Sequence, residues 1–403
     1  MKVILKSRYL LLFTSYFLFL NSCATLDTLS LSRQYFYRGE YEKAVDQFQL
    51  NKIISKKDKI LYELEYATSL MAAEKYTESS KMFNSIKERL KQQDIISVHQ
   101  KLLDLTLSDA ITEYRPSFYE RYLMHTLNAI NYLVLKDYEN ALIEAKLSIE
   151  DIDEYEQYFG FLGFIHYIAG LCYELNEDIN SAYIEYKKVY EYNNNLFFIL
   201  PKLKRLSWYL SRTDDYNTYN SIIESNNIPL SEFENKAEVI LIIAKDRAPI
   251  KKEYFIIVEE GEKISIPVYD SNYLNILPTK ILLDEIHIVN TDILLDLNPV
   301  TQKLNDRQMM KNIIKELVRV QTRKKVVDKT KERYGEKASE LMEYALFFLI
   351  HPDLRTWQTL PCSFQLKNFY VDKGEHSITI DGNIELNLII NDYKPSILFI
   401  RIP

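Results

Sequence analysis

Apolar side chains recur at helical spacing through the first half of the chain, over residues 31–228. Within this region a bulky residue is followed three positions later by a small one, as Tyr41 is followed by Ala44. Side chains three positions apart lie on the same face of a helix. We therefore expect the small residue to let a neighbouring helix approach, while the bulky residue fills the angle between the two helices. The pattern predicts helices that pack in pairs.

The same pattern recurs in looser form along this region. The later copies carry, at the matching positions, Tyr76, Ser79 and Phe83; Tyr138, Ala141 and Ala145; and Ile179, Ala182 and Tyr186. Each later copy is preceded by another apolar helical segment, as in a helical hairpin. The first two copies are 35 residues apart, counted from Tyr41 to Tyr76 (76 − 41), and the later spacings are longer. After the fourth copy Pro201 interrupts the pattern, and residues 202–223 predict a terminal helix or pair.

These segments resemble the tetratricopeptide repeat, most closely in the sequences YRGEYEKAVDQFQ and AGLCYELNEDINSAYIEY. That repeat has a period of about 34 residues and forms helix–turn–helix units that stack into a solenoid. The resemblance implies an extended concave surface that could bind a peptide or a protein. Ordinary amphipathic helical hairpins are the alternative interpretation.

The pattern changes near Pro229. Residues 237–244 (AEVILIIA) form a β-branched apolar run, which is typical of a strand. The remaining elements are predicted as strands at residues 254–258, 264–269, 281–289, 293–297, 363–371, 376–380, 384–390 and 397–402, and as helices at residues 306–334 and 337–350. A break at Gly335 separates the two helices. We interpret residues 229–403 as one α+β domain, in which strands from its beginning and its end share a sheet around a helical insertion.

The beginning of the chain follows a different pattern. Three cations and no acid precede an apolar run at residues 9–20. This run is too short to span a bilayer, which takes roughly 20 apolar residues. A positive head followed by a short apolar stretch predicts that residues 1–22 are a secretory signal peptide.

The predicted signal ends before Cys23, which follows Leu20, Asn21 and Ser22. The order Leu-x-x-Cys resembles the signal of bacterial lipoproteins. The resemblance implies cleavage before Cys23, lipidation of its thiol, and a short tether at residues 23–30. Each buried CH₂ of an acyl chain contributes about 0.8 kcal/mol, so two or three chains hold a protein durably at a membrane. An ordinary signal peptide, or a short membrane helix with a chance cysteine, is the alternative.

Composition narrows the classes of function. Of the 403 residues only 8 are Gly whereas 31 are Tyr, which argues against Gly-rich nucleotide-binding loops. The formal net charge is −7, and removal of three cations with residues 1–22 makes it −10 (47 − 57). An acidic exterior gives no general attraction to nucleic acid. We therefore expect no nucleic-acid partner.

No arrangement of residues predicts chemistry. The histidines show no metal-ligand spacing with one another or with a cysteine; they are His99, His125, His166, His287, His351 and His376. Cys172 lies in an apolar helical stretch and Cys362 lies near the end of the chain. One disulfide could join them, but we expect two free and mostly buried thiols. We predict no catalytic residue, no metal ion and no cofactor, and hence a protein that is not an enzyme.

A basic helix is predicted in the second domain. Cations are dense between Lys311 and Lys337, on a helix that also has an apolar side. We favour a solvated helix face, with Glu316, Asp328 and Glu332 as local counterions. The alternative is a cationic helix that faces lipid headgroups or an acidic partner.

A second distinctive segment runs from Asp353 to Pro361, between a predicted helix and a predicted strand. It contains Arg355 and Trp357. We favour a structural corner, in which Trp357 plugs the core and Arg355 hydrogen-bonds to loop carbonyls. The alternative is a binding edge exposed to a partner.

Four features of the chain belong together. They are the Leu-x-x-Cys signal, a helix with Glu120, Arg121, Leu123 and His125, a strand onset at Ala237, and the motif from Asp353 to Pro361. Together they resemble a group of uncharacterised bacterial tetratricopeptide-containing lipoproteins, in which the strand onset carries Gly instead of Ala. The resemblance implies the layout of the chain and no established activity.

From the helix pairs and this resemblance we expect a membrane-anchored scaffold in envelope assembly or secretion, at the outer membrane facing the periplasm. Its partners would be other envelope or secretion proteins, bound through the repeats, and the lipid bilayer, bound through Cys23. One alternative is a ligand-binding accessory lipoprotein of a transport system, with a closed, aromatic-lined pocket in the repeats. Another is a hydrolase of envelope polymers, with clustered acids or a Cys/His pair in a cleft of the second domain.

Overall fold

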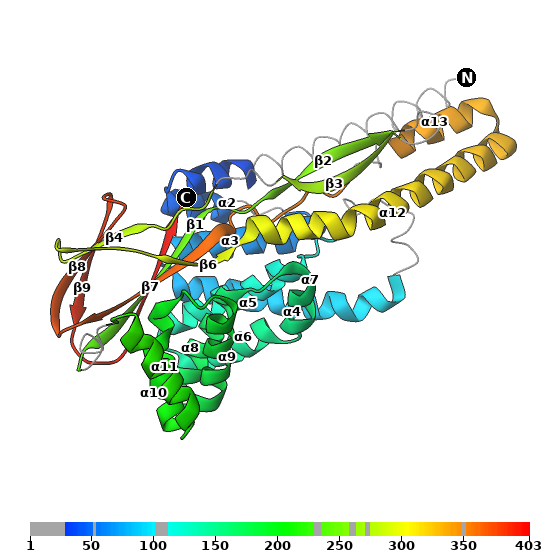
Figure 1. Ribbon diagram of the computed structural model, residues 1–403. Coiled ribbons are helices and arrows are strands. Elements are labelled where there is room, and N and C mark those ends of the chain that lie inside the picture. Colours follow the sequence, from blue (N-terminus) through cyan, green and yellow to red (C-terminus); the bar gives the residue numbers. More distant parts are fainter. Residues whose placement is uncertain are drawn as a thin grey trace.

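The computed structural model describes residues 29–50, 54–100, 112–228, 235–257, 263–270, 275–347 and 352–403. A helical first half is followed by strands and two further helices, so the predicted fold class, helical repeats followed by an α+β part, is confirmed (Figure 1). The helices of the first half are residues 29–37, α2 (Tyr41–Leu50), α3 (Lys59–Ala72), α4 (Tyr76–Gln100), α5 (Phe118–Val134), α6 (Tyr138–Ile149), α7 (Ile152–Phe159), α8 (Gly163–Leu175), α9 (Ile179–Tyr192), α10 (Leu200–Tyr209) and α11 (Thr213–Ser225).

Turns between paired helices share one geometry. In each, the residue two positions before the second helix has a positive φ; these residues are Gly39, Glu74, Lys136, Glu177 and Ser211. The backbone N–H of the following residue donates a hydrogen bond to the carbonyl oxygen five positions earlier. Asp178, for example, donates to Tyr173 at 3.0 Å. This closes the end of the first helix. The turns at Glu177 and Ser211 are 34 residues apart (211 − 177), so α10 and α11 form a further pair at the period of the repeat.

The small residues lie where the sequence pattern requires them. Ala44, Ala141 and Ala182 are each 0% exposed. Gly170 on α8 is equally constrained, because a Cβ at this position would lie 2.8 Å from the ring of Tyr186 on α9. The predicted register of the helix pairs is therefore confirmed.

The array departs from a regular repeat in two places. α4 is 25 residues long, which is more than the pairing with α3 requires. The short helix α7 is inserted between α6 and α8, and the turns on either side of it are 41 residues apart (177 − 136). α7 is thus an addition to the helix-pair pattern.

The strands of the second half form two four-stranded sheets and a separate hairpin. The elements are β1 (Ala237–Arg247), β2 (Ile250–Ile257), β3 (Lys263–Asp270), β4 (Lys280–Leu283), β5 (His287–Asn290), β6 (Asp292–Asp296), α12 (Leu297–Tyr334), α13 (Glu336–Phe347), β7 (Pro361–Val371), β8 (Gly374–Ile380), β9 (Ile384–Ile390) and β10 (Ser396–Ile402). The sheet orders are β10-β1-β7-β6 and β5-β4-β8-β9, and β2 pairs with β3. β1 runs parallel to β10 and antiparallel to β7, so strands from the beginning and the end of this half share a sheet, as predicted.

One predicted strand is wrong. Residues 281–289 do not form a single strand but most of the hairpin β4–β5. The chain reverses at Asp284 and Glu285, where φ is 50° and 57°. Tight hairpin turns favour Asn-Gly or Asp-Gly, and the pair Asp-Glu is a much weaker signal within an apolar run.

β1 is buried on both faces, which makes the body three layers deep. Ile240 and Ile242 belong to a hydrophobic cluster shared with the helices. Leu241 and Ile243 belong to a second cluster shared with the sheet β5-β4-β8-β9. The continuous apolar run of residues 239–244 is therefore that of a strand covered on both sides.

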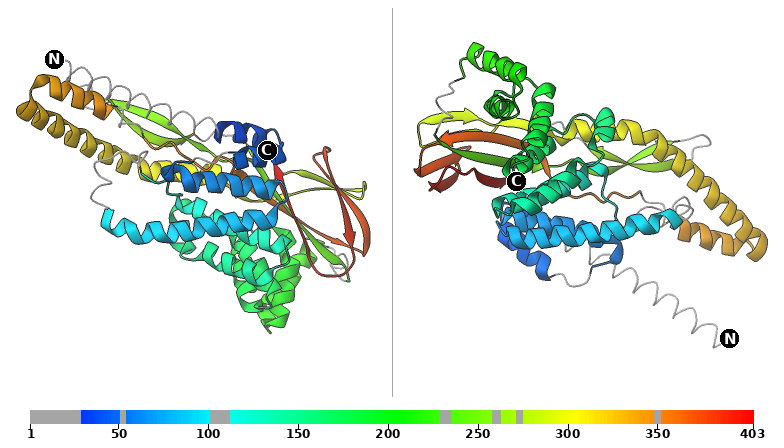
Figure 2. Two further views of the ribbon diagram at one scale, coloured as in Figure 1. Left: turned by 180° about the vertical axis from the view of Figure 1, so that it is seen from behind. Right: turned by 90° about the horizontal axis from the view of Figure 1, so that it is seen from below.

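The two helices of the second half and the hairpin β2–β3 form an arm that projects from this body (Figures 1 and 2). We define the arm as β2, β3, α13 and residues 306–334 of α12. The start of α12 instead lies in the core, where Leu297 and Leu304 are buried. The chain turns from α12 into α13 at Gly335, with φ of 85°, as predicted. Within the described ranges, none of the helices combines the length and the apolar sequence that a membrane span requires.

Candidate functional site: the seam between helices and strands

The first helices of the pairs face the strands of the second half across an extended contact. We call this contact the seam; it lies between α3, α5, α8 and α10 on one side and β1, β7 and residues 353–360 on the other. Phe164 on α8 stacks on Phe364 of β7 with ring centroids 4.4 Å apart. Buried side chains from both halves form one hydrophobic cluster. The expectation of an open concave surface is wrong, because the chain itself covers this face of the repeats.

Residues 353–360, which we call the strap, run along this face without helix or strand. Trp357 is 1% exposed. Its Nε1–H donates to Thr68 Oγ1 at 2.9 Å, and its backbone N–H donates to Glu120 Oε1 at 3.2 Å. Trp357 is therefore a plug in the core, and the interpretation of this segment as a structural corner is confirmed.

Arg355 ties the start of the strap to two loops of the helical half. Its guanidinium donates to the carbonyl oxygens of Lys57 and Thr112, each at 3.0 Å, as predicted. It also pairs with Asp58 at 2.9 Å and with Asp353 at 2.8 Å. Burial would lower the pKa of Arg355, but the bonds to Asp353 and Asp58 outweigh this effect and the pKa is raised. Arg355 therefore stays charged and saturated with acceptors.

A buried glutamate of the helical half accepts hydrogen bonds from the backbone of the strap. Glu65 on α3 accepts hydrogen bonds from the backbone N–H groups of Gln358 at 2.8 Å and Thr359 at 3.2 Å, and it pairs with Arg33 at 2.7 Å. An ionised carboxylate can accept several such bonds, which offsets the cost of burying it. The sequence analysis did not identify Glu65. The available signal was an acid on the apolar face of a predicted helix.

An ionic network crosses the seam further along. Lys202 on α10 is 1% exposed and lies 3.2 Å from Glu174 on α8 and 2.7 Å from Glu238 on β1. The other oxygen of Glu238 accepts from Asn368 of β7 at 2.7 Å. Burial would raise the pKa of Glu174, but Lys202 and Arg205 outweigh this effect and the pKa is lowered. Each buried charge thus has a partner of the opposite sign, and the ion pair between Lys202 and Glu238 crosses the seam.

A cavity of about 310 Å³ opens where the strap, the hairpin β2–β3 and α12 meet. Lys251 on β2, Arg115 and Asp353 are among its lining residues. Lys251 donates to the carbonyl oxygen of Arg355 at 3.3 Å. Burial would lower the pKa of Lys251, but Tyr269 and nearby carboxylates outweigh this effect and the pKa is raised. This cavity is polar and lies at the seam, whereas the accessory-lipoprotein alternative predicted an aromatic-lined pocket within the repeats.

The two described cysteines are free and buried, as predicted. Burial raises the pKa of Cys172, and it raises the pKa of Cys362 to about 12. Both thiols are therefore poor nucleophiles at neutral pH. Cys23 and the signal peptide at residues 1–22 lie outside the described residues, so lipidation stays a prediction.

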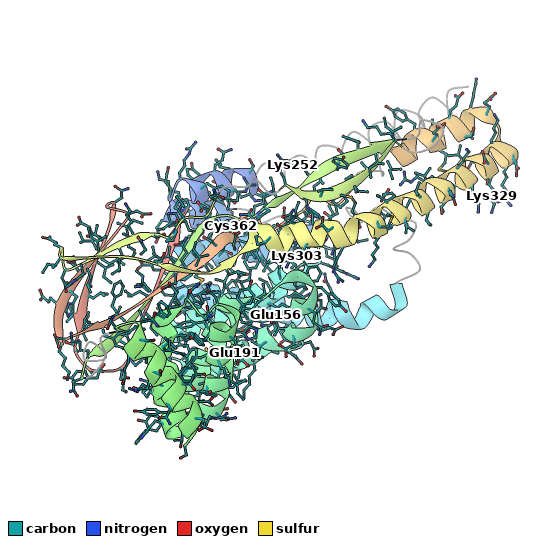
Figure 3. The ribbon with its side chains drawn as sticks, in the orientation of Figure 1. Glu156, Glu191, Lys252, Lys303, Lys329 and Cys362 are labelled. Carbon is teal, nitrogen blue, oxygen red and sulfur yellow. The ribbon has the colours of Figure 1, made fainter. Side chains whose placement is uncertain are left out.

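The predicted basic helix is α12, and Lys324 and Lys329 are among its exposed cations. Figure 3 labels Lys329 near the far end of this helix. Glu316 is buried and pairs with Arg319 at 2.5 Å and with Arg323 at 3.3 Å. Glu316 is therefore a local counterion, as predicted. The exposed cations further along α12 agree with a solvated helix face.

One cluster of potential ligands was not predicted. His166 on α8 lies 2.5 Å from Glu185 through Nδ1 and 3.2 Å from Glu156 through Nε2, and Asp153 is close by. Burial would lower the pKa of His166, but the bonds to Glu156 and Glu185 outweigh this effect and the pKa is raised. These residues come from three helices at unrelated spacings, so no sequence motif marks them.

Comparisons with known proteins add little. No protein-family model matches the chain, and no curated protein matches it. Solved structures of repeat proteins are similar over about half of it. MamA from Desulfovibrio magneticus RS-1 (from residue 41 on) is 12% identical with a TM-score of 0.35, over 52% of this chain and 96% of that chain.

Two further structures are similar at the same level. A tetratricopeptide repeat protein from Parabacteroides merdae ATCC 43184 is 14% identical with a TM-score of 0.35, over 51% of this chain and 68% of that chain. Kinesin light chain-like repeats from Podosopora anserina are 12% identical with a TM-score of 0.34, over 50% of this chain and 93% of that chain. Scores this low carry no argument, so the assignment of the fold rests on the helix pairs themselves.

The class that the fold defines is a protein with tetratricopeptide-like repeats. The evidence is the recurring turn geometry and the buried small residues at the predicted register. In this chain the inner face of the repeats is joined to an α+β part through the seam.

Proposed function

We propose that the protein is a membrane-anchored, non-catalytic protein-binding scaffold that works outside the cytoplasm, in cell-envelope assembly or secretion. Repeat arrays of this class commonly bind protein partners, although here the chain itself covers the inner face. The charged head, short apolar run and Leu-x-x-Cys order before residue 24 support export and lipid attachment at Cys23. The resemblance to bacterial lipoproteins supports a place at the outer membrane, facing the periplasm.

The observation that carries this proposal is the contrast between a filled inner face and an exposed arm. Apolar residues of the arm that are more than half exposed are Tyr254, Ile257, Met310, Ile314, Tyr334, Leu341 and Tyr344. Exposed cations such as Lys329 and Lys337 lie among them. Exposed apolar side chains next to lysines could contact a protein partner whose surface has an apolar patch surrounded by acidic residues. We therefore propose that the partner binds the arm and not the inner face of the repeats.

Site-specific photo-crosslinking in native cells tests the arm. A photoreactive residue in place of Leu341, which is 76% exposed on α13, should give a discrete crosslinked protein band. The matched control is Ile143 on α6, which is 53% exposed on the outer side of the repeats. A band at position 143 and none at position 341 would assign the partner to the repeats instead. No band at either position would argue against a scaffold.

Metabolic labelling with an alkyne fatty acid tests the anchor. Label should enter the wild-type protein and be lost in Cys23→Ala. Cys172→Ala is the control and should keep its label, since Cys172 is buried. Equal labelling of wild type and Cys23→Ala would contradict the lipid anchor.

A second candidate function, binding of a small anionic ligand for a transport system, is favoured by the cavity at the seam. Lys251 and Arg115 bring positive charge to it. A ligand that binds only the folded state raises the melting temperature. Differential scanning fluorimetry with inorganic phosphate and with acetate tests this candidate. The rise should vanish in Lys251→Gln and persist in Lys252→Gln, an exposed neighbour on β2. No rise with either anion in the wild type would argue against the candidate.

A further inference from the structure

The helix that interrupts the repeat pattern carries carboxylates toward a buried histidine. Asp153 and Glu156 lie on α7, and His166 lies on α8. One potential ligand atom from each of the three residues lies within 4.8 Å of the others. α7 packs beside the start of α12, and Figure 3 shows Glu156 on α7 with Lys303 on the neighbouring stretch of α12. The inserted helix therefore has a specific effect, which is to bring two acids to the imidazole.

The imidazole is held in a fixed orientation. Glu185 on α9 lies 2.5 Å from Nδ1 of His166. The ring of Phe161 stacks parallel to the imidazole, with centroids 4.8 Å apart. His166 itself is 0% exposed. A carboxylate that accepts the Nδ1 proton leaves the lone pair of Nε2 for a ligand, as in carboxylate–histidine–metal arrangements.

The distance on the other side of the ring fits a shared ion. Nε2 of His166 lies 3.2 Å from Oε1 of Glu156. Nitrogen and oxygen ligands lie about 2.0–2.1 Å from Zn²⁺ in tetrahedral sites. Two such ligand atoms are then about 3.3 Å apart. These two atoms therefore need little movement to bind one ion, and a rotation of the exposed Asp153 side chain would add the third ligand.

The charge balance also favours a cation. Three carboxylates, those of Asp153, Glu156 and Glu185, surround His166. Lys188 pairs with two of them, at 3.5 Å from Asp153 and 3.4 Å from Glu185. The side chain of Lys188 is 33% exposed, so it can turn into solvent when another cation arrives. Lys188 is thus a competitor for the cation site.

We propose that Asp153, Glu156 and His166 bind a divalent transition metal ion, with Zn²⁺ as the best fit, and that Glu185 positions His166. Imidazole with carboxylates suits Zn²⁺ and neighbouring transition metals better than Mg²⁺ or Ca²⁺, which prefer oxygen ligands alone. Three protein ligands leave one position for water. The ion links α7 to α8, at the place where α7 is inserted into the helix-pair pattern. This inference is independent of the proposed scaffold function.

Titration of the full-length, detergent-solubilised protein with Co²⁺ after chelator treatment tests the site. Tetrahedral Co²⁺ gives visible d–d absorption, so the probe reports the coordination itself. We expect one Co²⁺ per chain, displaced by Zn²⁺. Glu156→Gln should weaken binding by at least about tenfold. Glu154→Gln removes the same charge from an exposed position of α7 and should leave the affinity unchanged within about twofold.

Two further variants separate a metal site from a buried imidazolium with two counterions. Glu185→Gln keeps the ligand set but weakens the hold on Nδ1, and it should lower the affinity about 10–100-fold. Lys188→Gln removes the competing cation and should raise the affinity. If Glu156→Gln does not fold, Asp153→Asn at its exposed position carries the same test. Absence of the d–d absorption, or equal affinities for Glu156→Gln and Glu154→Gln, would overturn the proposal.

Discussion

The seam and the arm contain the same kinds of residue in opposite settings. In the seam, Lys202 and Trp357 are each 1% exposed and are bonded across the junction. In the arm, Lys329 is exposed and Leu341 is 76% exposed. These pairs of residues are of similar type, and they differ in burial and in the bonds that they make. We infer that the seam holds the fold together and that the arm is the surface available for binding.

The two tryptophans give the largest expected difference. Trp357→Ala should lower the free energy of unfolding by about 4 kcal/mol, because it leaves a cavity in the core and removes a hydrogen bond to Thr68. Trp208 on α10 is 65% exposed, and Trp208→Ala should change the free energy by no more than about 0.5 kcal/mol. Urea denaturation followed by circular dichroism measures both. Similar losses in the two variants would contradict the buried role of the strap.

The two lysines give the next largest difference. Lys202→Met should lower the free energy of unfolding by about 3 kcal/mol, because Glu174 and Glu238 stay buried and lose a cation between them. Lys329→Met on the arm should have an effect of less than about 0.5 kcal/mol. Urea titrations of the two variants provide the comparison. A neutral Lys202→Met would show that the network is not needed across the seam.

A smaller effect is expected inside the helix pairs. Ala141→Leu should lower the free energy of unfolding by about 2 kcal/mol, because position 141 is 0% exposed and has no room for a larger side chain. Glu139→Leu, at an exposed position of the same helix, is the control. Thermal melts of both variants measure the difference. A neutral or stabilising Ala141→Leu would mean that the helix pairs are registered differently.

The smallest effect concerns pH. Burial would raise the pKa of Glu144, but its bonds to His125 and Lys87 outweigh burial and lower the pKa. The stability that this carboxylate contributes is therefore present above its unfolded pKa of about 4.3 and is lost as the pH falls through the folded pKa. Glu144→Gln should have a lower free energy of unfolding than wild type at neutral pH. The difference between the two proteins should become smaller as the pH is lowered. Glu139→Gln should show no such convergence in urea titrations at successive pH values.

Local patterns were sufficient for most of the elements and for the register of the helix pairs. The spacing of Tyr138 and Ala141 predicts a contact within one helix pair, and it depends only on neighbours in sequence. The apolar run at residues 237–244 likewise predicts a strand buried on both sides once helices are known to cover it. The hairpin β4–β5 was missed because Asp284 and Glu285 are a weak turn signal.

The packing of the helices against the strands was not predictable from the sequence. The strap contacts α3 through Glu65, almost 300 positions away in sequence, and no local pattern specifies that pairing. For the same reason the inner face of the repeats was expected to be open. The cluster around His166 draws side chains from α7, α8 and α9, at spacings that match no metal motif. Two long-range features were recognised. Strands from the beginning and the end of the second half share a sheet, and Trp357 is buried at a corner that prolines bracket.

The central claim is that the helices and the strands are one body joined at the seam, with the arm outside it. Hydrogen–deuterium exchange on the full-length protein tests this directly, since exchange reports the free energy of opening segment by segment. Peptides from α5 and β7 should exchange slowly and lose protection together as urea is added, while peptides from α13 exchange faster. Separate openings of α5 and β7, or an arm protected as strongly as β7, would contradict the account.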